Sequence, residues 1–308
     1  MKVLVIGGLG FVGSAICQYC KDLNDIDLVV MDNQSKGSLK NIDGVNCEFI
    51  QVDITESKAT QDVINSTKPD IVLHLAAMHF IPDCNRDPVS CLHTNIIGTE
   101  NVLLACKQAA SVKKVIVTSS QAIYPIKDSP NNEEDLPQPC DVYGESKLAN
   151  EFQALRFNRD TNINTIVVRL ANVYGPRETN PHVIPEIMNQ LAAGKYRISL
   201  GNIEPKRDFI FTSDVARAFI TLSLATNLPG FTIFNLGSGK EYSIKEIIAK
   251  LSNVVENEIT YEKDLSRYRT TERMHLIADI SKIRNLTSWY PQVSIDQGLR
   301  DLCLWYKI

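Results

Sequence analysis

The sequence predicts an α/β protein in which a doubly wound parallel sheet is followed by a smaller C-terminal α/β lobe. Up to about residue 170, short apolar runs alternate with helical patterns. A glycine-rich turn, Gly7–Gly13, follows the first apolar run and opens the first helical pattern. Beyond Asn172 this alternation breaks, because Pro176, Pro181 and Pro185 interrupt the chain. Apolar strands separated by helices are typical of a parallel sheet covered on both faces.

The strands expected in the main sheet are short and apolar. They are Lys2–Ile6, Asp27–Met31, Cys47–Ile50, Asp70–His74, Val115–Val117 and Thr165–Arg169. The helical patterns between them are Phe11–Lys21, Ser57–Ser66, Pro88–Ala110 and Tyr143–Asn158. Ligands of such sheets bind beyond the carboxyl ends of the strands. The turns that follow these strands are therefore expected to form one crevice.

The second part of the chain is expected to supply a substrate-binding lobe. We expect residues 1–172 to form the nucleotide-binding domain and to receive residues 207–236, while 173–206 and 237–308 form the smaller lobe. Its expected elements include a helix opened by a capping box of Ser243 and Glu246. The others are the helix Glu186–Gly194, a strand from Lys206 to Phe211, the helix Ser213–Ala225, the strand Phe231–Leu236 and a helix near Ile295–Tyr306.

Composition excludes several classes of protein. With 44% hydrophobic residues in 308, the chain can bury a substantial core, and a net charge of −4 provides no basic surface for nucleic acid or anionic lipid. No apolar run reaches the roughly 18 residues of a membrane span, and no signal peptide is evident. The eight cysteines lack disulfide spacing, which favours a reducing cytoplasm. Cys17 and Cys20 are expected to be core residues of a helix, and no metal site is predicted.

The glycine-rich turn predicts a dinucleotide site of the Rossmann type. Gly7 would allow the tight turn, Gly10 would let the backbone approach a pyrophosphate, and Gly13 would let the helix pack on the strand. The first-turn N–H groups, including those of Phe11 and Val12, lack partners within a helix and attract anions. The alternative is a glycine turn with a purely structural role.

Asp32 predicts that the dinucleotide is NAD. It ends the second apolar run, about 20 residues beyond the glycines, where a carboxylate accepts hydrogen bonds from the adenosine ribose and repels a 2′-phosphate. The alternative is a solvated turn residue, because Asp32 to Gly37 is rich in turn formers, and Lys36 could weaken the preference for NAD.

Ser120, Tyr143 and Lys147 are the expected catalytic residues. Tyr143 and Lys147 are four residues apart, on one face of a helix. An ammonium group, like an oxidised nicotinamide, would lower the pKa of the phenol, which is about 10 when unperturbed. Ser120 follows the fifth strand, where its hydroxyl could share a substrate proton with Tyr143. The alternative is a turn serine beside a surface Tyr–Lys pair.

These motifs resemble the extended short-chain dehydrogenase/reductases, and within them the NAD-dependent nucleotide-sugar epimerase/dehydratase family. The pattern is most similar to that of 4-epimerases of UDP-glucose, and it covers nearly the whole chain. The matching residues are the three glycines, Asp32, Leu75-Ala76-Ala77, Asn95, Ser119-Ser120, Tyr143 with Lys147, Arg169–Gly175, Lys206–Ile210 and Ala278–Lys282.

The resemblance implies roles for further residues. Asp53, with Ile54, would bind the adenine edge, and Asn95 would support the cofactor site. Asn33, Leu75, Ala76, Ala77 and Ser119 are further expected cofactor contacts. Asn172 would hold the nucleotide diphosphate, Arg207 and Arg269 would clamp its oxygens, and His79 could contact the sugar. The alternative for each arginine is ordinary surface charge, and His74 is expected to be a core residue.

The reaction implied is 4-epimerisation of a nucleotide sugar, with UDP-sugars favoured, in cytoplasmic carbohydrate metabolism. Sugar dehydratases of the family carry an Asp-Glu pair where this chain has Gln121 and Ala122, so dehydration is not expected. An NAD(P)H-dependent reductase of a 4-keto nucleotide sugar and a non-catalytic dinucleotide sensor are the alternatives. Leu276 leaves open whether N-acetyl sugars fit. The resemblance also implies a homodimer formed through the helices Pro88–Ala110 and Tyr143–Asn158.

Overall fold

A seven-stranded parallel sheet forms the centre of the computed structural model, which describes residues 1–178, 180–267 and 272–308. Every pair of neighbouring strands in this sheet runs parallel. The order across the sheet is β10 (Phe231–Leu236), β6 (Asn164–Leu170), β5 (Lys114–Ser120), β4 (Ile71–His74), β1 (Lys2–Ile6), β2 (Asp27–Asp32) and β3 (Glu48–Gln51). The order reverses between β1 and β4, which is where a doubly wound sheet opens its crevice.

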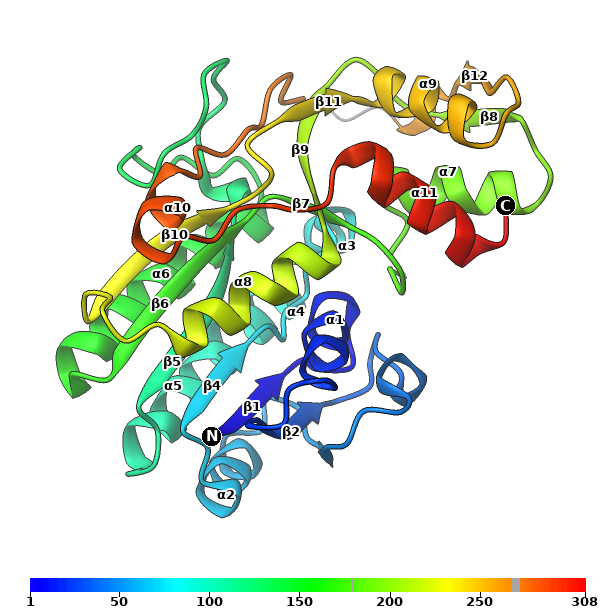
Figure 1. The fold of residues 1–308 in the computed structure, drawn as a ribbon. Helices are drawn as coiled ribbons and strands as arrows, with labels where there is room; N and C mark the ends of the chain where they lie inside the picture. The colour runs from blue at the N-terminus through cyan, green and yellow to red at the C-terminus, as the bar shows by residue number, and fades with distance from the viewer. Residues whose placement is uncertain (179, 268–271) are drawn as a thin grey trace.

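Helices cover both faces of this sheet, so the predicted doubly wound arrangement is confirmed (Figure 1). The helices α1 (Phe11–Cys20) and α8 (Thr212–Leu224) lie on one face. The other face carries α2 (Ser57–Thr67), α5 (Gly98–Gln108) and α6 (Val142–Thr161). In β1, Val3 and Val5 pack toward α1, whereas Leu4 and Ile6 pack toward α2 and α5. Because both faces are buried, such strands are apolar throughout.

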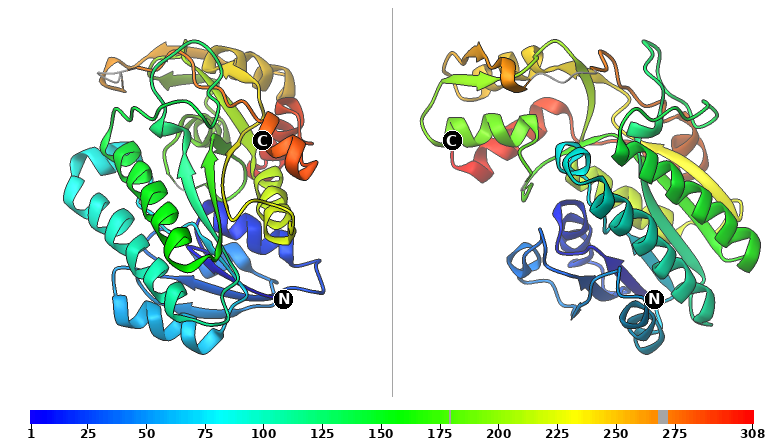
Figure 2. Two further views of the ribbon diagram at one scale, coloured as in Figure 1. Left: turned by 90° about the vertical axis from the view of Figure 1, so that its left-hand side faces the viewer. Right: turned by 180° about the vertical axis from the view of Figure 1, so that it is seen from behind.

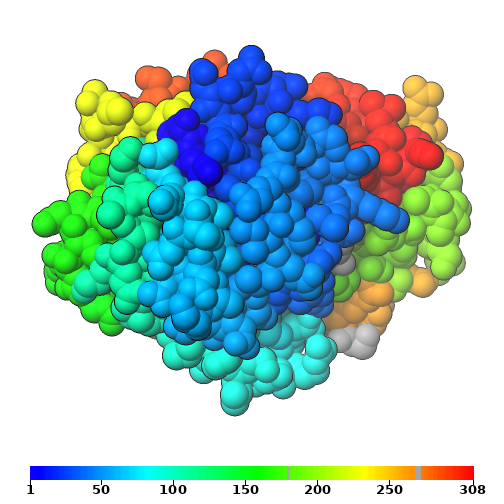
Figure 3. Space-filling view, turned by 90° about the horizontal axis from the view of Figure 1, so that it is seen from below, coloured from blue at the N-terminus to red at the C-terminus, as the bar shows by residue number. Residues whose placement is uncertain are grey.

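A smaller lobe lies over the carboxyl ends of the main strands (Figure 1). It contains the three-stranded sheet β11 (Glu241–Ser243), β9 (Lys206–Phe211) and β7 (Asn172–Tyr174), and the pair β8 (Arg197–Leu200) and β12 (Thr260–Lys263). Its core is formed with α7 (Val183–Ala192), α9 (Ile244–Val254) and α11 (Ile295–Tyr306). From below, the N-terminal part of the chain, blue to cyan, covers the centre of the molecule (Figure 3).

The segment 207–236, which we expected to join the first domain, is divided between the two parts. β10 lies at the edge of the main sheet and α8 packs against α1. β9, however, pairs with β7 and runs antiparallel to β11. β9 thus belongs to the sheet of the smaller lobe, whereas β10 and α8 lie with the main sheet.

The predicted helix Pro88–Ala110 is not uniform. It consists of α4 (Pro88–Leu92), a π-helical turn at His93–Ile97 and α5, and it is preceded by the unpredicted α3 (Ile81–Arg86). Turns of this kind often mark functional sites. The helix α7 begins three residues before the predicted start at Glu186, because Pro185 can occupy a first helical turn. The remaining short elements are α10 (Ser281–Thr287) and the 3₁₀ turns Leu39–Ile42, Gln121–Ile123 and Leu265–Arg267.

Two features expected from the sequence, the burial of two cysteines and the lack of a long apolar run, can be compared with the structure. Cys17 and Cys20 are buried on α1 within the main core, as predicted. Among the helices that the structure describes, none combines the length and apolar character needed to cross a bilayer.

Lys114 anchors the end of α8 to the main sheet. It is 8% exposed, and its Nζ donates to the carbonyl oxygens of Leu222, Ser223 and Ala225 at 3.0, 2.7 and 2.6 Å. Lys114→Met should lower the free energy of unfolding by about 1–3 kcal/mol, because these helix-end carbonyls would lose their donor inside the protein. The neighbouring Lys113 provides the control, since its exposed side chain only pairs with Asp70. Lys113→Met should change stability by less than about 1 kcal/mol in urea unfolding, and equal losses in the two variants would contradict this role.

Candidate active site

The three glycines of the first turn have different surroundings. Gly7 has φ +83°, and a Cβ there would lie 2.6 Å from the backbone nitrogen of Ala76. A Cβ at Gly13 would lie 2.1 Å from the Gly7 carbonyl oxygen. At Gly10, which caps α1, the nearest such atom is 3.3 Å away. The chain itself therefore requires Gly7 and Gly13, whereas Gly10 leaves backbone open to a ligand at the N-terminus of α1. This cradle fits a dinucleotide pyrophosphate.

Alanine substitutions should separate the two kinds of glycine. Gly10→Ala should fold with a melting temperature close to that of the wild type but bind NAD at least about tenfold more weakly, because its methyl group would occupy the space in which phosphate meets backbone. Gly13→Ala should lose both stability and binding, since its methyl group overlaps the Gly7 carbonyl. Thermal melts and calorimetric titration with NAD check both variants, and undiminished NAD affinity in Gly10→Ala would contradict the assignment.

Asp32, at the end of β2, holds the glycine turn in place through hydrogen bonds. Its carboxylate, 8% exposed, accepts hydrogen bonds from the backbone N–H groups of Leu9 at 3.1 Å and Gln34 at 2.7 Å. Burial raises the pKa of Asp32, while hydrogen bonds from Gln34, Leu9 and Gly10 act in the opposite direction. A carboxylate held beside this turn would meet the adenosine ribose and disfavour a 2′-phosphate.

The residues expected to contact adenine follow β2 and β3. Asn33 donates from Nδ2 to Asp53 Oδ2 at 2.7 Å. Asp53 Oδ1 also accepts from the N–H and hydroxyl of Thr55, and these bonds lower the pKa of Asp53 despite the opposing effect of burial. Ile54 is buried, and its carbonyl accepts from Asn101. The structure thus joins Asn33, the residue after Asp32, to Asp53 and Ile54, which follow the neighbouring strand β3.

Asn95 fixes the turn after β4. It is fully buried on the π-helical turn, and its Oδ1 accepts from Met78 N at 2.8 Å. Its Nδ2 donates to Met78 O and to Ser146 Oγ, both at 2.9 Å. Leu75, Ala76 and Ala77 lie in this turn, with Ala76 against Gly7. Asn95 therefore supports the site by holding backbone and α6.

Ser120, Tyr143 and Lys147 meet at the carboxyl end of β5. Asp141 caps α6 by accepting from Gly144 N at 2.8 Å, which places Tyr143 in the first turn and Lys147 one turn later. Lys147 Nζ lies 5.9 Å from the centre of the Tyr143 ring and donates to Thr118 O at 2.9 Å. The Ser120 side chain lies beside the phenol, where its interaction lowers the pKa of Tyr143 and so opposes the effect of burial. A hydroxyl, a phenol and an ammonium group are thus arranged for proton transfer.

The predicted acidity of the Tyr143 phenol is wrong for the protein alone. Burial raises the pKa of Tyr143, and only the hydrogen bond with Ser120 opposes this effect appreciably. Burial also lowers the pKa of Lys147 to about 8, so its charge is itself poorly stabilised. Desolvation therefore outweighs the attraction expected between this ammonium group and a phenolate. The positive charge of an oxidised nicotinamide is the remaining predicted source of a lower pKa.

Two other polar residues near the strand ends, Ser119 and His74, form hydrogen bonds within the protein core. Ser119, an expected cofactor contact, is fully buried, and its hydroxyl donates to Glu151 Oε1 at 2.5 Å. Its side chain thus points toward α6 rather than into the crevice. His74 lies in the core, with Nε2 2.8 Å from Thr99 Oγ1 and a pKa that burial lowers to about 3. The expectation of a core histidine is confirmed.

The residues expected to hold a substrate come from the smaller lobe and the β4 turn. Asn172 is exposed on β7, next to β9, which carries Arg207. Arg207 donates to Glu272 Oε1 at 2.8 Å and to Arg273 O at 2.6 Å. Arg269 lies outside the described residues. Sequence reasoning missed Glu272 and Arg273, whose spacing to Arg207 contains no motif.

His79 contacts the loop that follows β7. Its Nε2 lies 2.8 Å from Asn180 Nδ2, within hydrogen-bond distance. Burial lowers the pKa of His79, while Glu178 opposes the shift. Glu178 pairs with His182 at 3.3 Å and has a side chain only 3% exposed. Glu178, Asn180 and His182 of this loop thus place polar groups against His79.

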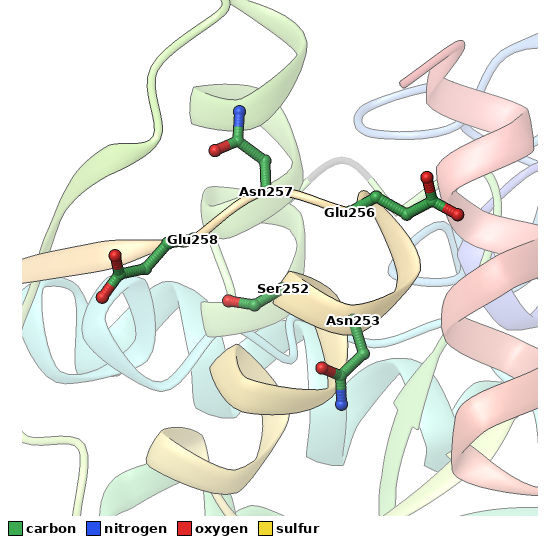
Figure 4. A pocket seen from close by; sticks show the side chains of 5 residues that line it. All are labelled: Ser252, Asn253, Glu256, Asn257 and Glu258. Atoms are coloured by element: carbon green, nitrogen blue, oxygen red, sulfur yellow. The ribbon is translucent and has the colours of Figure 1, made fainter.

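A surface hollow of about 460 Å³ lies elsewhere, at the turn between α9 and β12. It is lined by Ser252, Asn253, Glu256, Asn257 and Glu258. These side chains point away from one another, so they do not converge on a ligand (Figure 4). None of the expected site residues lines it.

Comparison with known proteins agrees with this geometry. The chain is similar to GDP-6-deoxy-D-mannose reductase of Pseudomonas aeruginosa, with 31% identity over 75% of this chain and 78% of the relative. It is also similar to dTDP-D-glucose 4,6-dehydratase of Homo sapiens, with 29% identity over 99% of this chain and 90% of the relative. The solved structure of UDP-glucose 4-epimerase from Thermotoga maritima with UDP-glucose superposes with a TM-score of 0.90 and 28% identity, covering 100% of this chain and 99% of the other.

The predicted resemblance is confirmed by a family model. The model of the NAD dependent epimerase/dehydratase family matches residues 3–237, which include the glycine turn, Asp32, Ser120, Tyr143 and Lys147. The chain therefore belongs to the NAD-dependent epimerase/dehydratase family, and its cofactor is NAD.

Proposed function

We propose that the chain is a nucleotide-sugar 4-epimerase that acts on UDP-sugars. The observation that carries the proposal is the position of Ser120 beside the Tyr143 phenol, next to Gln121 and Ala122, which provide no acid–base pair. Gln121 and Ala122 occupy the positions where sugar dehydratases resembling this chain carry acids. Gln121 is buried, and its Nε2 donates to Asn235 at 3.0 Å, so it takes no part in proton transfer. Epimerisation needs one proton acceptor and no elimination.

Each of the proposed site residues has its own role in this reaction. NAD, when bound, supplies the hydride acceptor and donor. Tyr143 takes the proton of the sugar 4-hydroxyl as that carbon is oxidised and returns it after the 4-keto sugar has turned over. Ser120, beside the phenol, shares the same proton, and Lys147 holds the ribose next to them. Arg207 and Asn172 retain the diphosphate while the sugar rotates, because guanidinium groups suit phosphate oxygens.

The proposal is tested by incubating the purified protein with UDP-glucose or UDP-galactose and no added cofactor. We expect the two sugars to interconvert, because NAD is regenerated in each cycle. Absolute dependence on added NAD(P)H would overturn the epimerase proposal. It would favour reduction of a 4-keto nucleotide sugar, for which the similarity to a GDP-6-deoxy-D-mannose reductase is the supporting observation.

We also propose that two copies of the chain associate through α5 and α6. These helices lie side by side on one face, in teal and green in the right-hand view of Figure 2. Their outer surface and the π-helical turn that leads into α5 carry large exposed apolar side chains, with Phe152 63%, Ile97 47% and Leu104 45% exposed. Such a surface favours association with a second apolar face. Sedimentation should give a dimer, and Phe152→Glu with Leu104→Glu should convert it to a monomer.

A further inference from the structure

Arg273 joins the smaller lobe to the turn that carries Ser120. Its side chain is buried, with the residue 8% exposed. Nη2 donates to the Ala122 carbonyl oxygen at 2.8 Å, and Nη1 reaches the Gln121 carbonyl oxygen at 3.4 Å. Nη2 also lies 3.0 Å from Cys140 Sγ. The partners of this guanidinium within the described part of the chain thus belong to two segments that flank the catalytic residues.

The first of these segments determines where the Ser120 hydroxyl lies. Ser120 Oγ accepts a hydrogen bond from Ala122 N at 3.1 Å. The carbonyl of Ala122 is the group that Arg273 holds. This carbonyl also touches α6, because a Cβ at Gly144 would lie 2.7 Å from it. Ala122 is therefore bound on one side to Ser120 and on the other to Arg273 and the first turn of α6.

The second segment determines where α6 begins. Cys140 directly precedes Asp141, the residue that caps α6, and Tyr143 follows in the first turn. A single guanidinium thus contacts both the turn of Ser120 and the chain that leads into Tyr143. The fork of an arginine can bond several acceptors in fixed directions, which a lysine cannot do.

The backbone of Arg273 is held by the segment expected to bind substrate. Arg207 Nη1 donates to the Arg273 carbonyl at 2.6 Å, and Arg207 Nη2 pairs with Glu272 at 2.8 Å. The next residue, Met274, accepts from Lys206 N at 2.8 Å. Arg273 is therefore anchored to the start of β9, and its side chain crosses from there to β5 and α6.

We propose that Arg273 is a positioning residue that fixes the separation of Ser120 and Tyr143 from the strand that carries Arg207. Its partners are backbone carbonyls and a sulfur, and no carboxylate is among its contacts in the described residues. A buried guanidinium without an acid is poorly explained by charge pairing. It is well explained by the need to hold two chain segments in one geometry. This proposal rests on the proposed function, because that function requires Ser120 and Tyr143 to share one proton.

The test compares Arg273→Met with Arg273→Lys in steady-state kinetics. In Arg273→Met we expect kcat to fall about 10- to 100-fold, because small displacements of catalytic groups have effects of this size. KM for the UDP-sugar should change less than about threefold, since substrate contacts stay in place. Methylguanidine should restore part of the activity of Arg273→Ala. The matched control is Arg197→Met on β8, whose exposed side chain pairs with Glu262, and its kinetics should not change.

The outcomes separate this proposal from the epimerase proposal. A wild-type kcat in folded Arg273→Met, or a change confined to KM, would overturn the positioning role and leave the epimerase proposal intact. If Arg273→Met does not fold, Arg273→Lys decides by the same criterion, with far-UV circular dichroism as the check on folding. If the wild type proves to be a 4-keto sugar reductase, the epimerase proposal fails, and the same variants are compared in that reaction, since it uses the same serine and tyrosine.

Discussion

Tyr143→Phe is expected to lower kcat by about 100- to 10,000-fold, the usual contribution of a positioned acid–base group. The phenol is the group in the site able to take the sugar hydroxyl proton, because Gln121 and Ala122 beside it cannot ionise. The aromatic ring is retained, so the contact with Lys147 at 5.9 Å from the ring centre persists. The melting temperature and the affinity for NAD should therefore stay close to those of the wild type.

Tyr290→Phe is the matched control, because Tyr290 is 54% exposed and lies outside the crevice. It should leave kcat unchanged, while Ser120→Ala should give a smaller loss than Tyr143→Phe because the phenol remains. Initial rates of sugar interconversion measure all three variants. Near-normal turnover by Tyr143→Phe would contradict the proposed mechanism. Retention of every biological activity by this variant, with NAD still bound, would favour a dinucleotide sensor.

The central sheet could be predicted because its strands are buried on both faces. All seven of its strands appear in the sequence as apolar runs, including Phe231–Leu236 from the later part of the chain, and each pairs as expected for a parallel sheet. The strands of the smaller lobe were harder to identify. β7 and β11 have three residues each, and all four residues of β12 are exposed, so neither length nor apolar character marks them. Their pairing depends on partners distant in the sequence.

The candidate site was predictable where the chemistry depends on local spacing. Gly7, Gly10 and Gly13 lie within one turn and one helix start, and Tyr143 and Lys147 lie on one helix face. The orientation of Ser119 could not be predicted in this way, because it depends on a hydrogen bond to the buried Glu151 on α6. The contact of Arg273 with Ala122 could not be predicted from local spacing either, because the two residues are about 150 positions apart in the chain. The pKa of Tyr143 could not be derived from the sequence, because burial decides its direction.

Glu151→Gln and Arg169→Met are each expected to lower the free energy of unfolding by about 3–5 kcal/mol, because each leaves an unpaired charge or donor in the core. Arg169 and Glu151 have side chains only 3% and 6% exposed, and they form two parallel bonds, Nε to Oε1 at 2.9 Å and Nη2 to Oε2 at 2.8 Å. Arg169 also donates to the Tyr124 hydroxyl at 2.7 Å. The pair thus joins β6, α6 and the turn after Ser120.

The double variant tests whether stability arises from the pair itself or from avoiding one buried charge. Glu151→Gln combined with Arg169→Met removes both charges, so it should be less destabilised than the sum of the single losses. The exposed pair Arg197–Glu262 provides the control, and Arg197→Met should change stability by less than about 1 kcal/mol. Denaturant unfolding measures all of these variants. Single losses no larger than that of Arg197→Met would show that the core tolerates the isolated charge and that this network does not hold α6 against the sheet. Losses that add in the double variant would instead show that each residue acts through its other partners, such as Tyr124 for Arg169.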